Sequence, residues 1–330
     1  MTVIDKKKSY GFENQDVGNL RVVFMGTPSF AVPILEGLID RYQVVTVVCQ
    51  PDRKKDRKGN VIIPETKKVA LEHGIDVFQP SKIRFDYQRI IDANPDIIIT
   101  CAYGQIIPKE LIDFPKYGCI NVHGSLLPQL RGGAPIHWAI IRGFKETGIT
   151  IMSMSCKMDA GDIINQRSLE IGEEEILDSL YQRMSILGRD LLLETIPSIL
   201  NGTAKYFPQN EEKVTFGYNV SREDEKIHFE KTGMEIHNLV RGLNSVPGAY
   251  CFLDGKRMKV YEVKIVSDNE FSRGEFGEIV AVDKEGMIVC CKDGFVKILD
   301  IAMEGKKRCK VSDYFNGVHN KSLIGKVLES

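Results

Sequence analysis

The chain has 330 residues, an ordinary apolar content of 43% and a formal net charge of −1. Its length exceeds the usual size of one domain, so we expect two. The near-neutral charge excludes a generally basic nucleic-acid-binding surface, and any site for a polyanion must be a local patch.

The eight cysteines are scattered and form no Cys-x-x-Cys pair, which argues against a zinc site and against a disulfide framework. Several lie in apolar runs, as small core residues do in a reducing compartment. No apolar stretch approaches the roughly 20 residues that cross a bilayer, and the first twenty residues lack a signal-peptide core. We therefore expect a cytoplasmic protein without a membrane partner or a metal, in which residues 1–19 form an N-terminal extension.

From Leu20 onward, apolar runs typical of strands alternate with helical patterns. The runs cover residues 21–25, 44–49, 96–100 and 118–123. Alternation of this kind predicts a parallel sheet with helices on both faces, and near-continuous apolar strands are what burial on both faces requires. We predict an α/β catalytic domain over residues 20–208, with a Rossmann-like, mostly parallel sheet.

The turn Met25-Gly26-Thr27-Pro28 follows the first predicted strand, where dinucleotide-binding proteins carry a glycine-rich loop. The GxGxxG pattern is missing here, and no GxxxxGK[ST] occurs in the chain. NAD is therefore not expected as a cofactor, and a P-loop ATPase is excluded.

The second half of the chain changes pattern after a long predicted helix at 175–200, where apolar residues recur at spacings of three and four. Residues 209–225 are polar with weak periodicity and are predicted to form a linker. A helix is expected at 233–243, followed by short strands between the turn signals Asp254-Gly255, Glu285-Gly286 and Asp293-Gly294. Residues 226–330 should thus form a smaller β-rich, OB-like barrel domain.

The run from Asn121 to Pro128, Asn-Val-His-Gly-Ser-Leu-Leu-Pro, together with Asp159, carries the chemistry of an acyl-transfer site. Amide, imidazole and carboxylate can polarise a carbonyl, move a proton and orient the imidazole. Asn121 and His123 are two residues apart on a strand and so point to the same side of the sheet. Asp159 follows another apolar run, so we expect all three at one sheet edge.

Each of the three residues alone also fits an ordinary structural role. A strand-end histidine can be satisfied by a turn, asparagine forms turns, and acidic residues are common in loops. The combination of the three with the neighbouring motifs favours the catalytic interpretation.

Several motifs resemble methionyl-tRNA formyltransferases, from residue 20 to the tail Tyr314-Phe315-Asn316-Gly317. They are Val23-Phe24-Met25-Gly26-Thr27-Pro28, Gln50-Pro51-Asp52-Arg53, Ala102-Tyr103-Gly104-Gln105-Ile106-Ile107-Pro108, Arg131-Gly132-Gly133-Ala134-Pro135, the Asn121 to Pro128 run and the Asp159 loop. The HxSLLP and DxGD elements belong to the broader 10-formyltetrahydrofolate transferase superfamily, and the second domain and the loop after Arg53 favour the tRNA branch.

The resemblance implies transfer of a formyl group from 10-formyltetrahydrofolate, a co-substrate, to the α-amino group of methionyl initiator tRNA. Asn121, His123 and Asp159 match the family's catalytic trio. Asn121 and His123 would donate to the oxygen of the tetrahedral intermediate, and His123 would also move the proton. Asp159 would orient His123, stabilise its cationic form or hold a relaying water.

The resemblance also implies a folate site between two segments with apolar walls. One comprises Ser125, Leu126, Leu127 and Pro128, and the other comprises Tyr103, Gly104, Gln105, Ile106, Ile107 and Pro108. Core packing of the leucines and turn roles for the prolines remain compatible with this prediction.

The loop at 53–58 is predicted to contact the tRNA through Arg53, Lys54, Lys55, Arg57 and Lys58. These five cations and the single acid Asp56 give a net charge of +4 (5 − 1). Such charges position RNA through its phosphates without reading its sequence. Lys54-Lys55-Asp56-Arg57 stands where the family has Pro-Ala-Gly-Arg, so only Arg57 keeps its place. A solvated basic loop is the alternative.

Two further basic clusters lie in the predicted barrel and rank below this loop as tRNA contacts. They are Lys256, Arg257 and Lys259, and Lys306, Lys307, Arg308 and Lys310. Exposed hairpin lysines are an equally good interpretation.

Two alternatives to the tRNA substrate stay open. A formyltransferase acting on an amino sugar nucleotide or on glycinamide ribotide would share the trio, although the added domain and the basic loop disfavour the ribotide. A noncatalytic RNA-binding or folate-binding protein would not need an imidazole and a carboxylate beside an amide.

Overall fold

The computed structural model describes residues 19–53, 61–266, 271–315 and 323–330. The chain divides into two compact units, Met1–Ile120 and Asn121–Ser330. Within the described ranges no helix is both long and apolar enough to cross a membrane. The domain limits at 208 and 226, drawn from sequence patterns, stay predictions, and residues 1–18 of the expected extension lie outside the described ranges.

The first unit is built on four parallel strands in the order β3-β2-β1-β4. Their bounds are Arg21–Gly26 (β1), Gln43–Val48 (β2), Asp76–Phe78 (β3) and Ile97–Cys101 (β4). Every residue of β4 is buried, as its near-continuous apolar sequence predicts. The helices of this unit are α1 (Val32–Ile39), α2 (Glu65–Glu72), α3 (Gln88–Asp92) and α4 (Lys109–Asp113), and a 3₁₀ turn, η2, covers Ser29–Ala31.

The helix α1 shows how local sequence sets these elements. Phe30, Ile34 and Leu38, spaced as on one helix face, are all buried. Pro33 lies in the first turn, where its missing N–H costs no hydrogen bond and its fixed φ suits a helix. The proline therefore starts the helix.

Three further strands extend the sheet to seven, in the order β3-β2-β1-β4-β5-β6-β7. They are β5 (Cys119–His123), β6 (Glu146–Ser153) and β7 (Ile163–Glu170), and β6 and β7 pair antiparallel. The prediction of a Rossmann-like, mostly parallel sheet is confirmed. The antiparallel strand β7 was not predicted, because its exposed polar residues interrupt the apolar pattern.

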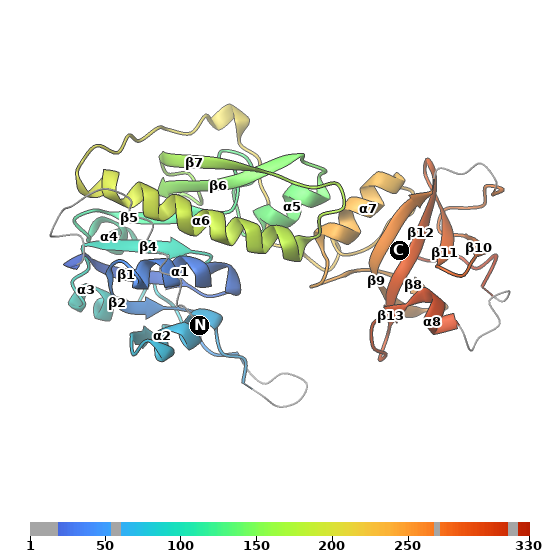
Figure 1. Cartoon of the computed structure of the whole chain (residues 1–330), viewed down its shortest axis with the longest axis horizontal. Coiled ribbons are helices and arrows are strands. Elements are labelled where there is room, and N and C mark those ends of the chain that lie inside the picture. Colours follow the sequence, from blue (N-terminus) through green and yellow to red (C-terminus); the bar gives the residue numbers. More distant parts are fainter. Residues whose placement is uncertain (1–18, 54–60, 267–270, 316–322) are drawn as a thin grey trace, which may run out of the picture. The chain divides into compact units, whose positions relative to one another are not determined.

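The long helix α6 (Leu177–Leu200) confirms the helix predicted at 175–200. Figure 1 shows α6 running along β6 and β7. Leu180, Met184 and Leu191 lie on its buried side at helical spacing. A shorter helix, α5 (Pro135–Ile141), follows the loop after β5, and a 3₁₀ turn, η3, covers Glu211–Lys213.

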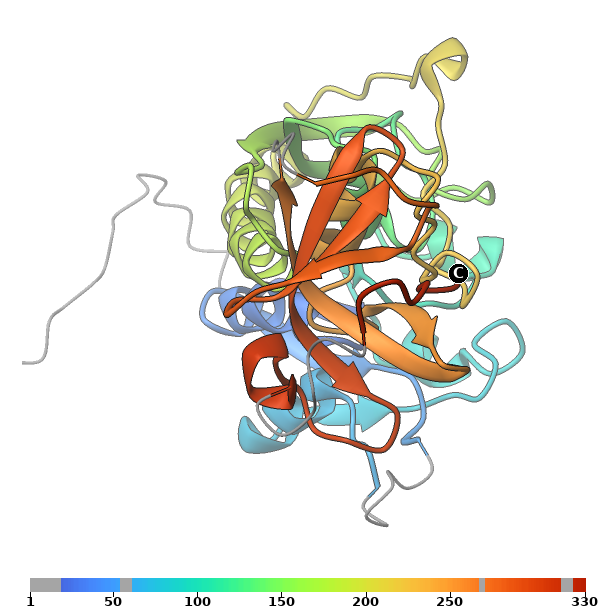
Figure 2. The same cartoon turned by 90° about the vertical axis from the view of Figure 1, so that its right-hand side faces the viewer.

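The C-terminal part of the second unit is a six-stranded antiparallel sheet with the order β10-β11-β12-β9-β8, and β13 pairs with β12. The strands are β8 (Ala249–Leu253), β9 (Lys256–Val266), β10 (Ile279–Val282), β11 (Met287–Cys291), β12 (Gly294–Met303) and β13 (Cys309–Lys310). All three predicted turn signals lie at connections between consecutive strands of this sheet, and Gly294 is itself the first residue of β12. Figure 2 shows the orange-to-red strands crossing at steep angles instead of lying flat.

The chain's last residues pair with both ends of this sheet. Phe252 of β8 forms a two-way backbone bridge with Glu329, with N–H to O distances of 2.8 and 3.0 Å. At the other end, Ile279 of β10 donates to the Lys326 carbonyl at 2.8 Å, and Leu328 donates to the Gly277 carbonyl at 2.8 Å. The C-terminal segment thus bridges the gap between the two outer strands of a partly open barrel.

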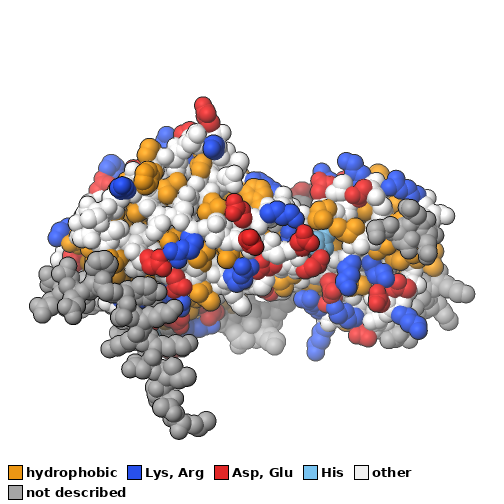
Figure 3. Space-filling view, turned by 45° about the horizontal axis from the view of Figure 1, so that its top comes forward, with side chains coloured by type: hydrophobic (Ala, Val, Ile, Leu, Met, Phe, Trp, Pro, Cys, Tyr) orange, Lys and Arg blue, Asp and Glu red, His pale blue; other side chains and the backbone are white. Residues whose placement is uncertain are grey.

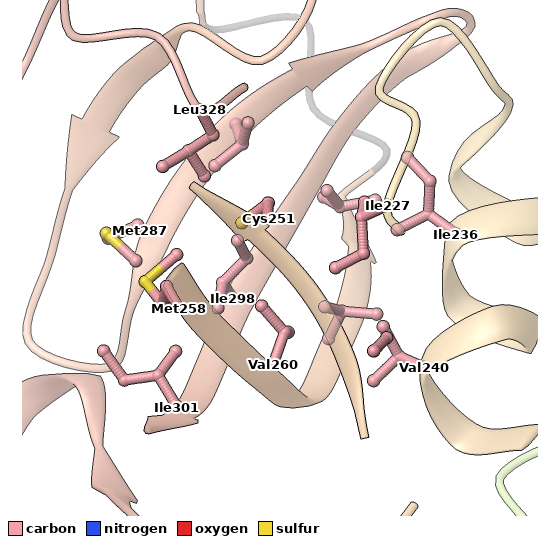
Figure 4. Packing of buried hydrophobic residues seen from close by; sticks show 14 of the residues in the cluster. Ile227, Ile236, Val240, Cys251, Met258, Val260, Met287, Ile298, Ile301 and Leu328 are labelled. Carbon is pink, nitrogen blue, oxygen red and sulfur yellow. The ribbon is translucent and has the colours of Figure 1, made fainter. Parts of the chain in front are cut away.

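The barrel core consists of buried apolar side chains from these strands and from α7 (Gly233–Gly242), which confirms the helix predicted at 233–243. Figure 4 shows Val260, Ile298 and Ile301 packed with Cys251 and Met258. Burial raises the pKa of the Cys251 thiol to about 12. Cys251 therefore stays a neutral thiol and packs as a small apolar residue. A short helix, α8, covers Val311–Phe315.

The start of α7 and its last turn are both held by polar contacts. Thr232 and Glu235 form a capping box at the N-terminus. Near the C-terminal end, the buried Arg241 donates to the carbonyls of Gly172 and Glu175, at 3.1 and 2.9 Å. The guanidinium thereby joins α7 to the turn that precedes α6.

Replacing Ile298 by Ala should lower the free energy of unfolding by about 2–5 kcal/mol, since this side chain is fully buried in the barrel core and its loss leaves a cavity. Denaturant unfolding followed by circular dichroism measures the change. Ile265→Ala, at a half-exposed position on neighbouring β9, is the matched control and should cost less than about 1 kcal/mol. Equal losses would contradict the assigned core.

Candidate active site

Asn121 lies in the middle of β5 and His123 ends it, and both are buried, with 9% and 5% of their surfaces exposed. Because alternate residues of a strand face the same side, the two polar side chains share one face. A buried imidazole and a buried amide at the end of an apolar strand cost free energy unless they are hydrogen-bonded or used in chemistry.

The ring of His123 has two different neighbours. Its Nε2 lies 3.1 Å from the carbonyl oxygen of Leu130. A carbonyl can only accept, so Nε2 carries the hydrogen and the neutral ring leaves Nδ1 with a lone pair. Nδ1 lies 3.8 Å from Oδ1 of Asp159, which is too long for a direct hydrogen bond.

Asp159 lies in the loop between β6 and β7 and has a left-handed backbone, with φ at 48°. Its Oδ2 accepts a hydrogen bond of 2.8 Å from the backbone N–H of Gly132. Gly132 itself has φ at 122°, and a Cβ there would come within 2.8 Å of the Gly217 carbonyl oxygen. The structure therefore brings Asp159 to His123 by fixing one carboxylate oxygen and leaving the other facing the ring.

Residues 209–217, which lie in the predicted linker, form hydrogen bonds with the loop that follows β5. Leu130 donates to the Thr215 hydroxyl at 2.9 Å and Arg131 donates to the Thr215 carbonyl at 2.9 Å. Gly217 returns a hydrogen bond of 2.8 Å to the Arg131 carbonyl. This pairing supports the loop that supplies both the His123 acceptor and the Asp159 donor.

Sequence reasoning missed Gln209 and gave Arg131 no role. The amide of Gln209 contacts both the Asp159 loop and the guanidinium of Arg131. A polar residue in a segment without periodicity gives no pattern to detect. The only available signal was the Arg131 motif itself, which the family resemblance includes.

The predicted folate segment Ser125 to Pro128 is tied down by Thr150 of β6. The Thr150 hydroxyl donates to the Ser125 carbonyl at 2.6 Å and accepts from the Leu127 N–H at 3.1 Å and from Gln166 Nε2 at 2.8 Å. Leu127 is buried, as core packing predicts, whereas Leu126 is half-buried. The segment is a fixed apolar turn.

The other predicted folate segment, Tyr103 to Pro108, lies in the first unit. Gly104 has φ at 84°, and the Tyr103 carbonyl accepts from Gln50 Nε2 at 2.9 Å. The amide of Gln105 is engaged with the backbone of Ile83 and Pro80 and with Gln50, while Ile106 is 78% exposed.

Other groups of this segment are buried. Ile107 is buried, and Pro108 precedes α4. The buried Tyr103 hydroxyl finds no hydrogen-bond partner among the described residues, and burial raises its pKa.

Of the five predicted tRNA contacts in the loop at 53–58, Arg53 alone lies in the described chain, where it is exposed and pairs with Ile62 through its backbone. Lys54, Lys55, Arg57 and Lys58 lie outside the described residues, as do Asn316 and Gly317 of the tail motif. In the barrel, Arg308 pairs with Asp300 and Lys310 with Glu262, and Figure 3 shows basic and acidic side chains intermingled there. Among the described residues no cluster of His, Cys, Asp and Glu suits a metal.

Two family models together match most of the chain. The model described as "Formyl transferase" matches residues 20–196, and the one described as "Formyl transferase, C-terminal domain" matches residues 219–319. The chain belongs to the formyl transferase family. It is therefore an enzyme of formyl transfer, and formyltetrahydrofolate is the co-substrate of that chemistry.

The relatives of this formyl transferase include many named methionyl-tRNA formyltransferase. One from Bacillus subtilis (strain 168) is 47% identical over 303 residues, which cover 91% of this chain and 95% of the relative. One from Malacoplasma penetrans (strain HF-2) is 42% identical over 320 residues, which cover 97% and 100%. The resemblance noted in the sequence is thereby confirmed.

Solved structures of formyl transferases share the fold at low identity. An N-formyltransferase from Helicobacter canadensis, in complex with folinic acid and dTDP-3-aminofucose, has a TM-score of 0.61 at 20% identity. The match covers 84% of this chain and 98% of that one. This structural match supports the fold alone, and the resemblance to methionyl-tRNA formyltransferases rests on the sequence relatives.

Replacing Thr150 by Val keeps the shape of this buried residue but removes every hydrogen bond of its hydroxyl. The Leu127 N–H and the Ser125 carbonyl would lose a partner, which typically costs about 1–3 kcal/mol in the free energy of unfolding. Thermal and denaturant unfolding of the formyl transferase measure this cost. Ser168→Ala, at an exposed position of β7, is the control and should change the value by less than about 0.5 kcal/mol.

Proposed function

We propose that this chain transfers the formyl group of 10-formyltetrahydrofolate to the α-amino group of methionyl initiator tRNA, in the cytoplasm and in support of translation initiation. The observation that carries the proposal is 42–49% identity to methionyl-tRNA formyltransferases over at least 90% of the chain. The identity includes the C-terminal domain, and the sugar-linked neighbour matches at only 20%.

Asn121 is assigned to the oxygen of the reacting formyl group. The amine attacks the formyl carbon, a carbon–nitrogen bond forms, and the carbonyl oxygen gains negative charge. An amide N–H aimed at that oxygen stabilises the intermediate, and the loss of one such donor typically costs about 3 kcal/mol. Burial of Asn121 supports this role because electrostatic interactions are stronger away from water.

His123 is assigned to the proton. The attacking amine must lose one proton, and the folate nitrogen must gain one as its bond to the formyl carbon breaks. Since Nε2–H is directed at the Leu130 carbonyl, Nδ1 is the ring nitrogen with a lone pair that can accept a proton. The geometry thus favours His123 Nδ1 for proton transfer.

Asp159 is assigned to the cationic form of His123. Its free oxygen, Oδ1, faces Nδ1 at 3.8 Å, a separation that leaves the ring nitrogen available to the substrate amine or to a relaying water. Once Nδ1 is protonated, the carboxylate stabilises the imidazolium electrostatically.

Two segments are each assigned to the folate: the apolar turn Ser125 to Pro128 and the segment Tyr103 to Pro108. The half-buried Leu126 and the exposed Ile106 offer apolar surface for the pterin. The buried Tyr103 hydroxyl, which has no hydrogen-bond partner in the described part of the chain, is a polar group available to a ligand. Arg53, Lys54, Lys55, Arg57 and Lys58 are assigned to the phosphates of the tRNA on the strength of their charge.

His123→Asn should lower the rate of formyl transfer by a factor of roughly 10² to 10⁴, because asparagine cannot accept the amine proton near neutral pH. Folate binding, measured by equilibrium titration, should stay close to wild type because the apolar turn is unchanged. Transfer near the wild-type rate would refute the assignment of His123.

Arg57→Glu should weaken the use of tRNA far more than the affinity for folate, since one attractive phosphate contact becomes repulsive. Steady-state kinetics at several salt concentrations separate the two KM values. Lys116→Glu is the control, because this exposed residue precedes β5, at the edge opposite the carboxyl ends of the strands. Equal losses for both substrates would remove the tRNA role of Arg57.

The direct test incubates the purified protein with 10-formyltetrahydrofolate and three amines, with mass spectrometry following the formyl group. The amines are methionyl initiator tRNA, glycinamide ribotide and an amino sugar nucleotide. Formylation of the tRNA alone is the expected result. Transfer to another amine would leave the trio in place but overturn the substrate, and RNA binding without transfer would overturn the reaction.

A further inference from the structure

The side-chain amide of Gln209 makes four hydrogen bonds that converge on the Asp159 loop. Its Nε2 donates to the carbonyl oxygens of Asp159 and Gly161, both at 2.8 Å. Its Oε1 accepts from Nε and Nη2 of Arg131, at 3.0 and 2.8 Å. Both halves of the amide are therefore used: its N–H groups bind the Asp159 loop, and its oxygen binds the guanidinium of Arg131.

The N–H groups of Gln209 bind one side of the Asp159 loop, and the end of β6 constrains its other side. A Cβ at Gly161 would lie 1.8 Å from the Ser153 carbonyl oxygen, so the loop presses directly on the end of β6. Ser153 also exchanges backbone and side-chain hydrogen bonds with Asp162. These contacts on both sides of the loop fix the left-handed φ of Asp159, a conformation that aspartate adopts more readily than most residues.

The amide oxygen of Gln209 accepts from Arg131, the neighbour of Gly132, whose N–H fixes the Asp159 carboxylate. Arg131 is 5% exposed, and its guanidinium also pairs with Glu211 at 2.8 Å, which holds the pKa of that carboxyl below its usual range. The following residue, Gly132, gives its N–H to Asp159 Oδ2. One amide thus joins the main chain of Asp159 to the segment that holds its side chain.

We infer that Gln209 is a positioning residue for the reaction, which keeps the free carboxylate oxygen of Asp159 directed at Nδ1 of His123. The inference rests on the proposed function, in which Asp159 acts on His123. No other side-chain type offers both donors and an acceptor in this plane at this length. A glutamate would place a charged acceptor against two carbonyl oxygens, and a methionine would fill the space without any hydrogen bond.

The first experiment compares Gln209→Met and Gln209→Glu in formyl transfer to methionyl initiator tRNA. Both should lower kcat about 10- to 100-fold, because a displacement of a reacting group by about 1 Å costs rates of this order. The KM for each substrate should stay within about twofold. The matched control is Glu212→Gln, at an exposed neighbouring position, which should leave both constants unchanged.

The pair of variants also shows which half of the amide acts. Gln209→Glu keeps an acceptor for Arg131, so a loss as large as that of Gln209→Met assigns the effect to the two donors. Melting temperature and equilibrium folate binding report whether each variant is folded. If Gln209→Met does not fold, Gln209→Glu alone decides the outcome.

The second experiment is a double-mutant cycle with Asp159→Asn. If Gln209 acts through Asp159, Gln209→Met should lower kcat no further in the Asp159→Asn background. Additive losses, a wild-type kcat in the single variant, or a rise in KM alone would each overturn the inference. A wild-type rate for Asp159→Asn itself would instead refute the proposed catalytic role of Asp159, and the positioning role with it.

Discussion

The hydrogen bond from the Gly132 N–H to Oδ2 of Asp159 is the contact on which the candidate site depends. It joins the loop after β5 to the loop after β6, two segments separated by 27 residues, and it engages one carboxylate oxygen only. The other oxygen is left facing His123 at 3.8 Å. The backbone is unusual on both sides of this contact: Gly132 has φ at 122°, and Asp159 has a left-handed φ of 48°.

The polar groups of the site are held mainly by backbone carbonyls and N–H groups. His123 is oriented by the Leu130 carbonyl, and Thr150 serves three partners at the folate turn. Such contacts depend on the path of the main chain, so the site is as rigid as the sheet edge that carries it. Side-chain substitutions that leave the backbone intact should therefore separate chemistry from folding.

Much of this arrangement was predictable from the sequence because it follows local patterns. Apolar runs indicated β1, β2, β4 and β5, helical spacing indicated α6, and the paired polar ends of two strands indicated that His123 and Asp159 would converge. The role of Gln209 was not predictable. Gln209 lies in a polar segment without periodicity, and the residue it contacts, Asp159, is 50 positions earlier in the chain. The edge strand β7 escaped for a similar reason, since its exposed residues are polar.

Residues 325–329 pair with both outer strands of the barrel, so one short segment covers the free edge of each strand. An unpaired strand edge exposes a row of N–H and C=O groups that can pair with another molecule. Displacement of this one short segment would open two such edges at once. Leu328→Pro, which removes the N–H that is donated to the Gly277 carbonyl, should therefore weaken this closure and promote self-association of the barrel.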